Sequence, residues 1–287
     1  MPVPGDLCLL QNLKSYMGGA NPTDTTNDGI LSGLITASST FIAAFLDRDL
    51  FTLGGQGISA IASVGTDSGG GFVTLTAPLP GIPPIATQVT DFTSGVVTNV
   101  IAPAAAMSNT NSKLYLASTT SLSAGDPVDF AFQLTYSETY NGSGKAWQWV
   151  KQWPIGSLNA VTDLPSGQPY SLTAIVADPE LPRLLFKTVL ANSSFILVLP
   201  TGELLGQIFS CGIQNLQVVY TAGYLAPPPD LSQAALELAV LWFKDRDRTA
   251  VSAQGMLGTH VSFFNTSDML PETRLKLNNY RRTLRGY

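Results

Sequence analysis

The sequence predicts an α+β fold in which a helical core carries one inserted small all-β domain. Both ends of the chain show helical periodicity, while a Gly/Ser/Thr-rich stretch between them has the alternation typical of strands. The chain has 287 residues and is 45% hydrophobic, enough to bury a sizeable core. We therefore expect core segments at 1–50 and 147–287, with the β-rich insert at 51–146.

Two helices are predicted at the N-terminal end. Asp6 is placed to cap the first, which runs to about Met17 and stops at Gly18-Gly19. Asp28 is placed to cap the second, which ends near Leu46. Apolar residues recur along it at three- and four-residue steps, at Ile30, Leu34, Ala37, Phe41 and Phe45.

Residues 51–144 are rich in small residues and poor in Lys and Arg. The segments 70–79 and 113–119 alternate between apolar and polar residues, and Gly- and Pro-rich turns separate them. Five to seven short strands in this stretch predict a small sandwich or barrel.

The C-terminal part is predicted to return to mixed structure. Strands are expected at 171–177, 193–200 and 216–224. A run of three prolines at 227–229 then precedes Asp230, which is placed to cap a helix that runs to about Arg248. Residues 250–270 have the composition of a loop or arm, and a last helix is expected from Pro271 almost to the end.

Charge is unevenly spread along the chain. Residues 242–287 hold eight of the 15 bases and four of the 20 acids, a balance of +4, which leaves −9 for residues 1–241. An acidic body argues against a general nucleic-acid-binding protein, and the basic tail fits an acidic partner. A solvated helix rich in Arg is the alternative. The charged fraction of only 12% favours a subunit that contacts neighbours.

Residues that carry chemistry are few. His260 is the one histidine, no nucleophile motif accompanies it, and Cys8 and Cys211 lie far apart. The segment Gly142–Lys145 lacks the flanking residues of a phosphate-binding loop. We predict no catalytic, cofactor or metal site, and hence no enzyme. Neither a signal peptide nor a membrane-spanning run is evident, so assembly in a reducing cytoplasm is expected.

Residues 216–248 contain a strand that ends in Tyr-x-Ala-Gly-Tyr, a Pro-x-Asp-Leu link and a helix with aromatic and basic residues at its end. Its structural motif residues are Tyr220, Gly223, Tyr224, Asp230 and Trp242. This arrangement resembles the head–tail adaptor (connector) proteins of tailed double-stranded DNA bacteriophages. The segments FIAAFLDRDL (41–50) and VKQWPIGSLNAV (150–161) resemble the same family, in the same order. The insert is not part of the resemblance.

The resemblance implies a structural protein of the virion neck. It implies a ring of about twelve copies below the portal, with DNA passing through the lumen during ejection without sequence-specific binding. The portal protein and a stopper or tail-completion protein are the implied partners, and no membrane is involved. An acidic lumen would limit contact with DNA phosphates. Independently of the family, Gly223 is expected to adopt a positive φ.

The basic tail is the expected portal interface, because Arg pairs with carboxylates through two hydrogen bonds. The interface candidates are Arg274, Tyr280, Arg281, Arg282, Leu284 and Arg285. Such a short helix is marginal alone in water, so it is expected to be mobile until docked. A helix packed on its own domain is the alternative.

Two other functions compete with the ring subunit. The β insert would carry a host- or carbohydrate-binding phage module, with Trp147, Trp149 and Trp153 as candidates for stacking on sugars. A cytoplasmic hydrolase with a β-sandwich domain is the third hypothesis, and the lack of a nucleophile or metal motif argues against it.

Overall fold

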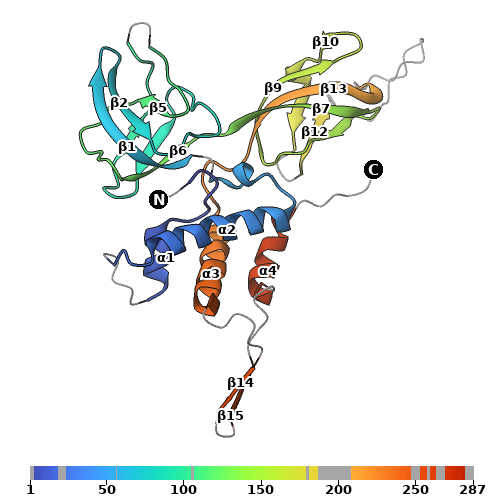
Figure 1. Cartoon of the computed structure of the whole chain (residues 1–287). Helices are drawn as coiled ribbons and strands as arrows, with labels where there is room; N and C mark the ends of the chain where they lie inside the picture. Colours follow the sequence, from blue (N-terminus) through green and yellow to red (C-terminus); the bar gives the residue numbers. More distant parts are fainter. Residues whose placement is uncertain are drawn as a thin grey trace, which may run out of the picture. The chain divides into compact units, whose positions relative to one another are not determined.

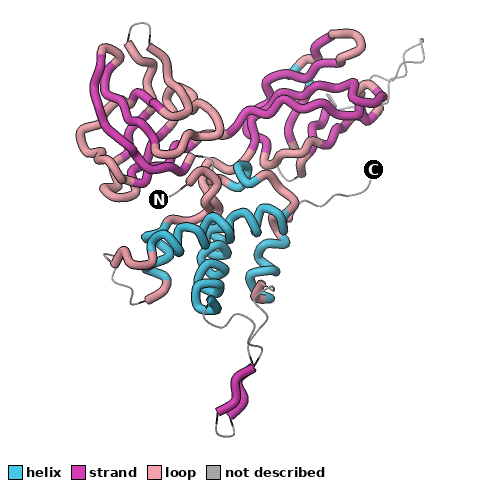
Figure 2. The backbone as a smooth tube through the Cα atoms, in the orientation of Figure 1, coloured by secondary structure: helices cyan, strands magenta, loops and turns pink. Residues whose placement is uncertain are grey.

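A computed structural model of the chain describes residues 3–18, 24–55, 57–104, 107–178, 181–186, 208–246, 253–256, 259–262 and 269–281 (Figures 1 and 2). Strands account for 34% of the structure and helices for 26%. Two compact units are formed, Met1–Phe132 with Leu225–Tyr287, and Gln133–Tyr224.

The predicted fold class is wrong. Over the described residues the molecule is mostly β, with three antiparallel sheets and a hairpin, and it is not a helical core with one small inserted β domain. One of these sheets lies wholly within the predicted insert, and the other two are built mainly from residues assigned to the core. The strands of the C-terminal part form two sheets together with one strand from the end of the predicted insert, where we expected them to complete a helical core.

The helical part of the first unit contains four α-helices in the described residues. They are α1 (Leu10–Tyr16), α2 (Asp28–Leu46), α3 (Pro229–Asp245) and α4 (Pro271–Asn278), with a short 3₁₀ helix η1 at Leu50–Leu53. α3 and α4 lie side by side and α2 crosses them (Figure 1). The apolar faces of both long helices pack together in this core. Leu31, Ile35 and Ile42 of α2 are buried in one cluster with Leu231 and Leu238 of α3.

Both predicted N-terminal caps are wrong. Asp6 lies before α1 and is buried, and its carboxylate accepts hydrogen bonds from the backbone N–H of Val3 and the hydroxyl of Thr36 (2.8 Å). Asp28 is the first residue of α2, whose cap position is Asn27. Its carboxylate forms an ion pair of 2.5 Å with Lys14, which ties α1 to α2. These acids therefore join segments of the core, and do not cap helices.

The first sheet has six strands. They are β1 (Ile58–Asp67), β2 (Gly70–Leu75), β3 (Gln88–Asp91), β4 (Val97–Asn99), β5 (Lys113–Tyr115) and β6 (Pro127–Ala131). Their order is β4-β3-β6-β1-β2-β5, all antiparallel. A bridge joins Val100 to Leu116, and the N–H of Ile101 donates to the carbonyl of Tyr115 (2.9 Å). The segments beyond the two edge strands therefore meet, and the sheet closes into a barrel.

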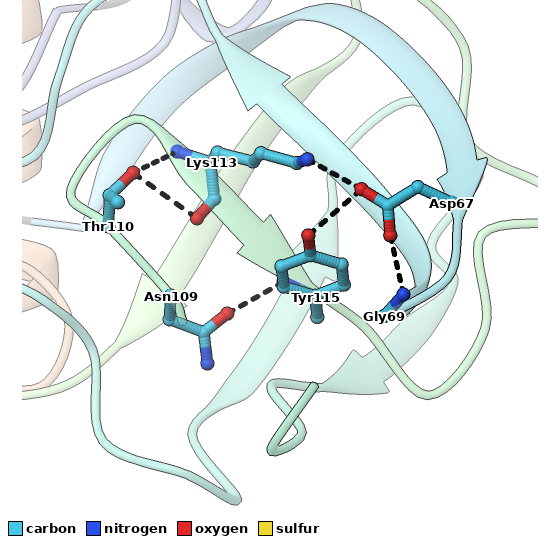
Figure 3. A network of polar contacts seen from close by, with 6 residues as sticks. All are labelled: Asp67, Gly69, Asn109, Thr110, Lys113 and Tyr115. Carbon is cyan, nitrogen blue, oxygen red and sulfur yellow. Dashed lines mark hydrogen bonds and ion pairs between the residues drawn. The ribbon is translucent and has the colours of Figure 1, made fainter. Parts of the chain in front are cut away.

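The barrel is filled by the inward-facing residues of its strands. Val73, Val89, Leu114 and Phe130 are completely buried. At the β1–β2 turn, the Asp67 carboxylate accepts from Lys113 (2.7 Å), from the Tyr115 hydroxyl (2.9 Å) and from the N–H of Gly69 (Figure 3). This network fixes β5 against the turn.

The second unit holds two sheets. The strand order is β10-β9-β13-β7 in one and β11-β12-β8 in the other. The strands are β7 (Leu134–Ser143), β8 (Trp147–Trp149), β9 (Ile155–Asp163), β10 (Gln168–Pro169), β11 (Ile175–Ala177), β12 (Arg183–Phe186) and β13 (Cys211–Ala222). A short 3₁₀ helix, η2 (Leu172–Ala174), precedes β11. Val161, Leu184, Phe209 and Val218 are completely buried in the shared core of this unit.

The composition change near residue 145 is not a structural boundary. β7, which we placed in the insert, pairs with β13 from Leu134↔Ala222 to Ser143↔Cys211. The predicted limit at 146/147 therefore lies inside the second unit, and the limit at 50/51 lies inside the first. Residues 193–200, where a strand was expected, lie outside the described residues. The expected arm at 250–270 contains a hairpin of β14 (Ala253–Met256) and β15 (Thr259–Ser262).

Among the described helices, α2 is long and apolar enough, by length and composition alone, to cross a membrane. Leu31, Ile35 and Ile42 on one side of it belong to the helical core described above. Hydroxyl groups on α2 also bond within the unit, as when Ser39 accepts a hydrogen bond from the N–H of Leu7 (3.0 Å).

Candidate interaction surfaces

The turn that follows β13 contains the glycine of the sequence motif. Gly223 has φ of +109°, which confirms the predicted positive φ. Its N–H donates to the carbonyl of Pro154 (2.9 Å), and its carbonyl accepts from the side-chain amide of Gln133 (2.5 Å). The turn is therefore fixed from two other segments of the same unit.

Tyr220 anchors the strand before this turn. Its completely buried hydroxyl donates to Glu138 (2.7 Å), lies 3.1 Å from the Tyr140 hydroxyl and accepts from the N–H of Gln152 (3.0 Å). Tyr140 also donates to Glu138 and accepts from the N–H of Lys151. Burial raises the pKa of both tyrosines above the usual range, so both stay protonated at neutral pH. The cluster is a structural link between β7, β13 and the β8–β9 connection.

The other aromatic motif residues make edge-to-face contacts. The ring of Tyr224 lies 6.2 Å from that of Trp153 in the second unit. Trp242, near the end of α3, lies 5.7 Å from Phe41 of α2. Each contact joins elements within its own unit.

Asp230 does not cap α3. The helix begins one residue earlier, at Pro229, with Pro228 in the cap position and no side-chain capping bond. Asp230 lies in the first turn, where a negative charge is favourable, and its carboxylate accepts from the Tyr280 hydroxyl (3.2 Å). The prediction failed because proline itself is compatible with the first helical position.

The described part of the C-terminal segment packs on its own unit. Leu277 is completely buried in the helical core, and Thr273 donates a hydrogen bond of 2.5 Å to Glu237 of α3. Lys276 also lies 3.8 Å from Glu237. The helix ends at Asn278, well before the predicted end. For residues 271–281 the structure therefore shows the alternative, a helix packed on its own domain.

The predicted portal-interface residues divide into two groups. Arg274 is exposed on α4, Tyr280 is half-buried, and the exposed Arg281 guanidinium lies 5.6 Å from the ring of Phe45. Arg282, Leu284 and Arg285 lie outside the described residues. The structure thus places two exposed bases on the helical body, which is the packed group of α1, α2, α3 and α4. Arg274 lies within α4, and Arg281 lies three residues after its last residue.

One side of α2 remains exposed. No charged residue lies between Asp28 and Asp47 of the sequence. Ile30 and Phe41 are 51% and 37% exposed, so two large apolar side chains face solvent on an uncharged helix. The exposed residues of this face are Gly29, Ile30, Gly33, Ala37, Thr40, Phe41 and Ala44.

The residues considered for chemistry are not brought together. His260 lies on β15, where only the backbone is described. Burial raises the pKa of the Cys8 thiol to about 12, and Cys211 is exposed on β13. In the ranges that the structure covers, no group of three or more His, Cys, Asp or Glu side chains is placed to hold a metal ion.

The tryptophans considered for sugar stacking lie in the second unit, outside the barrel. Trp147 and Trp149 contact each other edge to face on β8 (5.8 Å). The Lys145 ammonium lies 4.7 Å from the first ring, and the Arg183 guanidinium lies 5.9 Å from the second. The rings of this pair are therefore already in contact with one another and with cations of the same unit.

Sequence reasoning missed Glu138 and Tyr140, which surround the motif tyrosine. The segment LTYSETYNGS (134–143) alternates between apolar and polar residues, and this was the signal that could have identified β7. Composition drew attention away from it because the segment ends in Gly and Ser, like the stretch before it.

Neither the scan against protein-family models nor the search of curated proteins finds a match.

Proposed function

We propose that this protein is a structural subunit of a tailed-phage neck. In this role, about twelve copies form a ring that joins the portal vertex to the tail and surrounds the DNA exit channel. The subunit is not an enzyme and binds no cofactor. The virion neck is its location, after assembly in the host cytoplasm.

The observation that carries the proposal is the packing of α2 against α3. The two stretches of the helical body that resemble adaptor proteins lie near opposite ends of the sequence. Their apolar faces nevertheless form one core, with Leu46 of the first completely buried in one cluster with Leu231 of the second. The two helical parts of the resemblance therefore belong to one unit and share one core.

The exposed face of α2 supports a contact with another subunit. In a ring, one surface of each copy meets a different surface of the next. A helix face without charges can be buried in such a contact without desolvating an unpaired charge.

Exposed Arg274 and Arg281 support a contact with the portal. They lie on the helical body, near the basic end of the sequence. A protein of net charge −5 that gathers its bases in one terminal region is suited to an acidic partner at that region. The portal interface is therefore proposed to include the exposed side of α4.

Capture of the purified chain on immobilised portal rings tests this proposal. We expect the wild-type chain to bind and Arg274→Glu/Arg281→Glu to bind at least about tenfold more weakly, because like charges now face each other. Lys151→Glu, an exposed base in the other unit, is the matched control and should bind as the wild type does. Equal binding by all three proteins, or no binding by the wild type, would overturn the proposal.

A further inference from the structure

The barrel surface carries almost no free charge. Residues 57–132 contain only five charged side chains, at Asp67, Asp91, Lys113, Asp126 and Asp129. Asp91 and Asp129 are buried, and Asp67 pairs with Lys113 at 2.7 Å (Figure 3). Asp126 is half-buried and accepts a hydrogen bond from the N–H of Ser123 (2.7 Å). Between Thr76 and Ser112 no charged side chain reaches the surface.

Large apolar side chains are exposed on this same surface. Ile82 is 58% exposed and Ile85 is 64% exposed, on the loop between β2 and β3. Phe92, Val97 and Met107 are each more than one third exposed. A neutral surface with several exposed apolar side chains is characteristic of a protein–protein contact.

The loop that presents the two isoleucines is held in place. At the start of the loop, the N–H of Leu79 donates a hydrogen bond to the carbonyl of Asn111 (2.8 Å). At its end, the N–H of Ala86 donates to the carbonyl of Val100 (2.8 Å). Pro80, Pro83 and Pro84 restrict the backbone between these bonds. Because the loop is pre-organised, little conformational entropy is lost when it binds.

The chemistry of the surface selects among classes of partner. Nucleic acids and anionic membranes are bound through Lys and Arg, and the only base of the barrel, Lys113, already pairs with Asp67. A strongly charged protein would lose solvation without gaining an ion pair. The surface instead fits a partner that is neutral and partly apolar.

A second copy of this chain is such a partner. Each chain has net charge −5, so two copies repel each other where their charged surfaces meet. A contact through the nearly uncharged barrel avoids this repulsion. A ring also places equivalent barrels at one height and radius, which raises their effective concentration for one another. From these observations, and resting on the proposed ring, we infer that the barrel surface that carries Ile82 and Ile85 in each copy contacts a different part of the barrel of the next copy.

The test compares oligomer formation by full-length variants. Mass photometry of the purified wild-type chain should show assemblies whose population changes little between about 0.15 and 0.5 M salt, since an uncharged contact is not screened. Ile82→Lys/Ile85→Lys should raise the concentration needed for assembly at least about tenfold, and Ile82→Ser/Ile85→Ser should raise it less. Ile213→Lys is the matched control, because Ile213 is 86% exposed on β13 of the other unit. Circular dichroism should show that all variants are folded.

The outcomes separate this inference from the proposed function. Undiminished assembly of the lysine double variant overturns the barrel contact and leaves the ring untouched. A wild-type chain that is monomeric in solution but still binds portal rings also overturns the barrel contact, while the neck function stands. Loss of assembly in high salt would show a contact between charges, which contradicts the inference as well.

Discussion

At Gly223, one backbone angle sets the turn that follows β13. A φ of +109° is open to glycine and disfavoured for residues that carry a Cβ atom. The hydrogen bonds to Pro154 and Gln133 hold the turn in this conformation, so the backbone does not relax easily to a negative φ.

We therefore predict that Gly223→Ala lowers the free energy of unfolding by about 1–2 kcal/mol. Gly33→Ala on α2 is the opposite control, since its Cβ would meet open space in an exposed helix. That substitution should stabilise by up to about 1 kcal/mol. Urea denaturation measures both, and two effects of the same sign would contradict this account of Gly223.

A second single-residue effect concerns Asp129 in the barrel. The residue is only 8% exposed, and none of the described residues donates a hydrogen bond to its Oδ1 atom. Burial raises its pKa from 3.8 to about 7. The folded state thus holds the proton more tightly than the unfolded state, so stability falls as the pH rises from about 4 to about 7.

Asp129→Asn should consequently stabilise the protein at pH 8 by up to about 4 kcal/mol and have little effect at pH 4. Chemical denaturation of both proteins at the two pH values measures the difference. Asp67→Asn is the control of opposite sign, because the hydrogen bond from Lys113 lowers the pKa of Asp67. Its substitution should destabilise at pH 7 and matter less at pH 3. An increase in the free energy of unfolding by Asp129→Asn that is equal at pH 4 and pH 8 would refute the raised pKa of Asp129.

At the scale of elements, α4 changes the interpretation of the C-terminal segment. Because such a short helix is marginal alone in water, we expected it to be mobile until docked. Leu277 and Thr273 instead fix it to α3, through burial and through the hydrogen bond to Glu237. Exposed Arg274 then lies on a docked helix, where its position is defined before any partner arrives.

Leu277→Ala should destabilise the protein by about 2–4 kcal/mol, because it leaves a cavity in the helical core. Leu275→Ala on the same helix should change stability by less than about 0.5 kcal/mol, since Leu275 is 68% exposed. Thermal unfolding of the two variants gives the comparison directly. If both variants melt like the wild type, α4 is not part of the core.

Periodicity predicted the long helices and several strands correctly, but it does not indicate which strands pair with each other. The apolar steps of α2 and α3 and the alternation at 70–75 and 113–115 are local signals, and the elements lie there. The pairing of β7 with β13 is a long-range choice that composition cannot reveal. The aspartates at helix starts were misassigned because an acid near a helix can equally form an ion pair, as Asp28 does with Lys14.

For the whole molecule, the arrangement of the barrel predicts that it can be removed as a module. The N–H of Phe130 donates to the carbonyl of Gly57 (3.1 Å), so the chain enters and leaves the barrel at one place. The strands β1–β6 pair only among themselves in the described residues. The composition change near residue 51 marks one end of this module, but its other end lies near Phe132 and not near residue 146.

We predict that replacing residues 58–129 with a short Gly-Ser linker leaves a soluble protein with its helices intact. Circular dichroism should show undiminished helical signal, and urea should unfold the remainder cooperatively. A replacement that extends to residue 145 is the comparison, because it also removes β7 from its sheet and should unfold the second unit. Loss of the helices after the shorter replacement would show that the barrel is not independent.

We propose that this chain forms the ring that continues the portal. Negative-stain electron microscopy of purified portal rings mixed with the purified chain tests it most directly. We predict side views with an added, coaxial layer and end views with a closed ring of about twelve subunits around an open centre. Portal rings that stay bare at saturating concentrations of the chain would contradict the account.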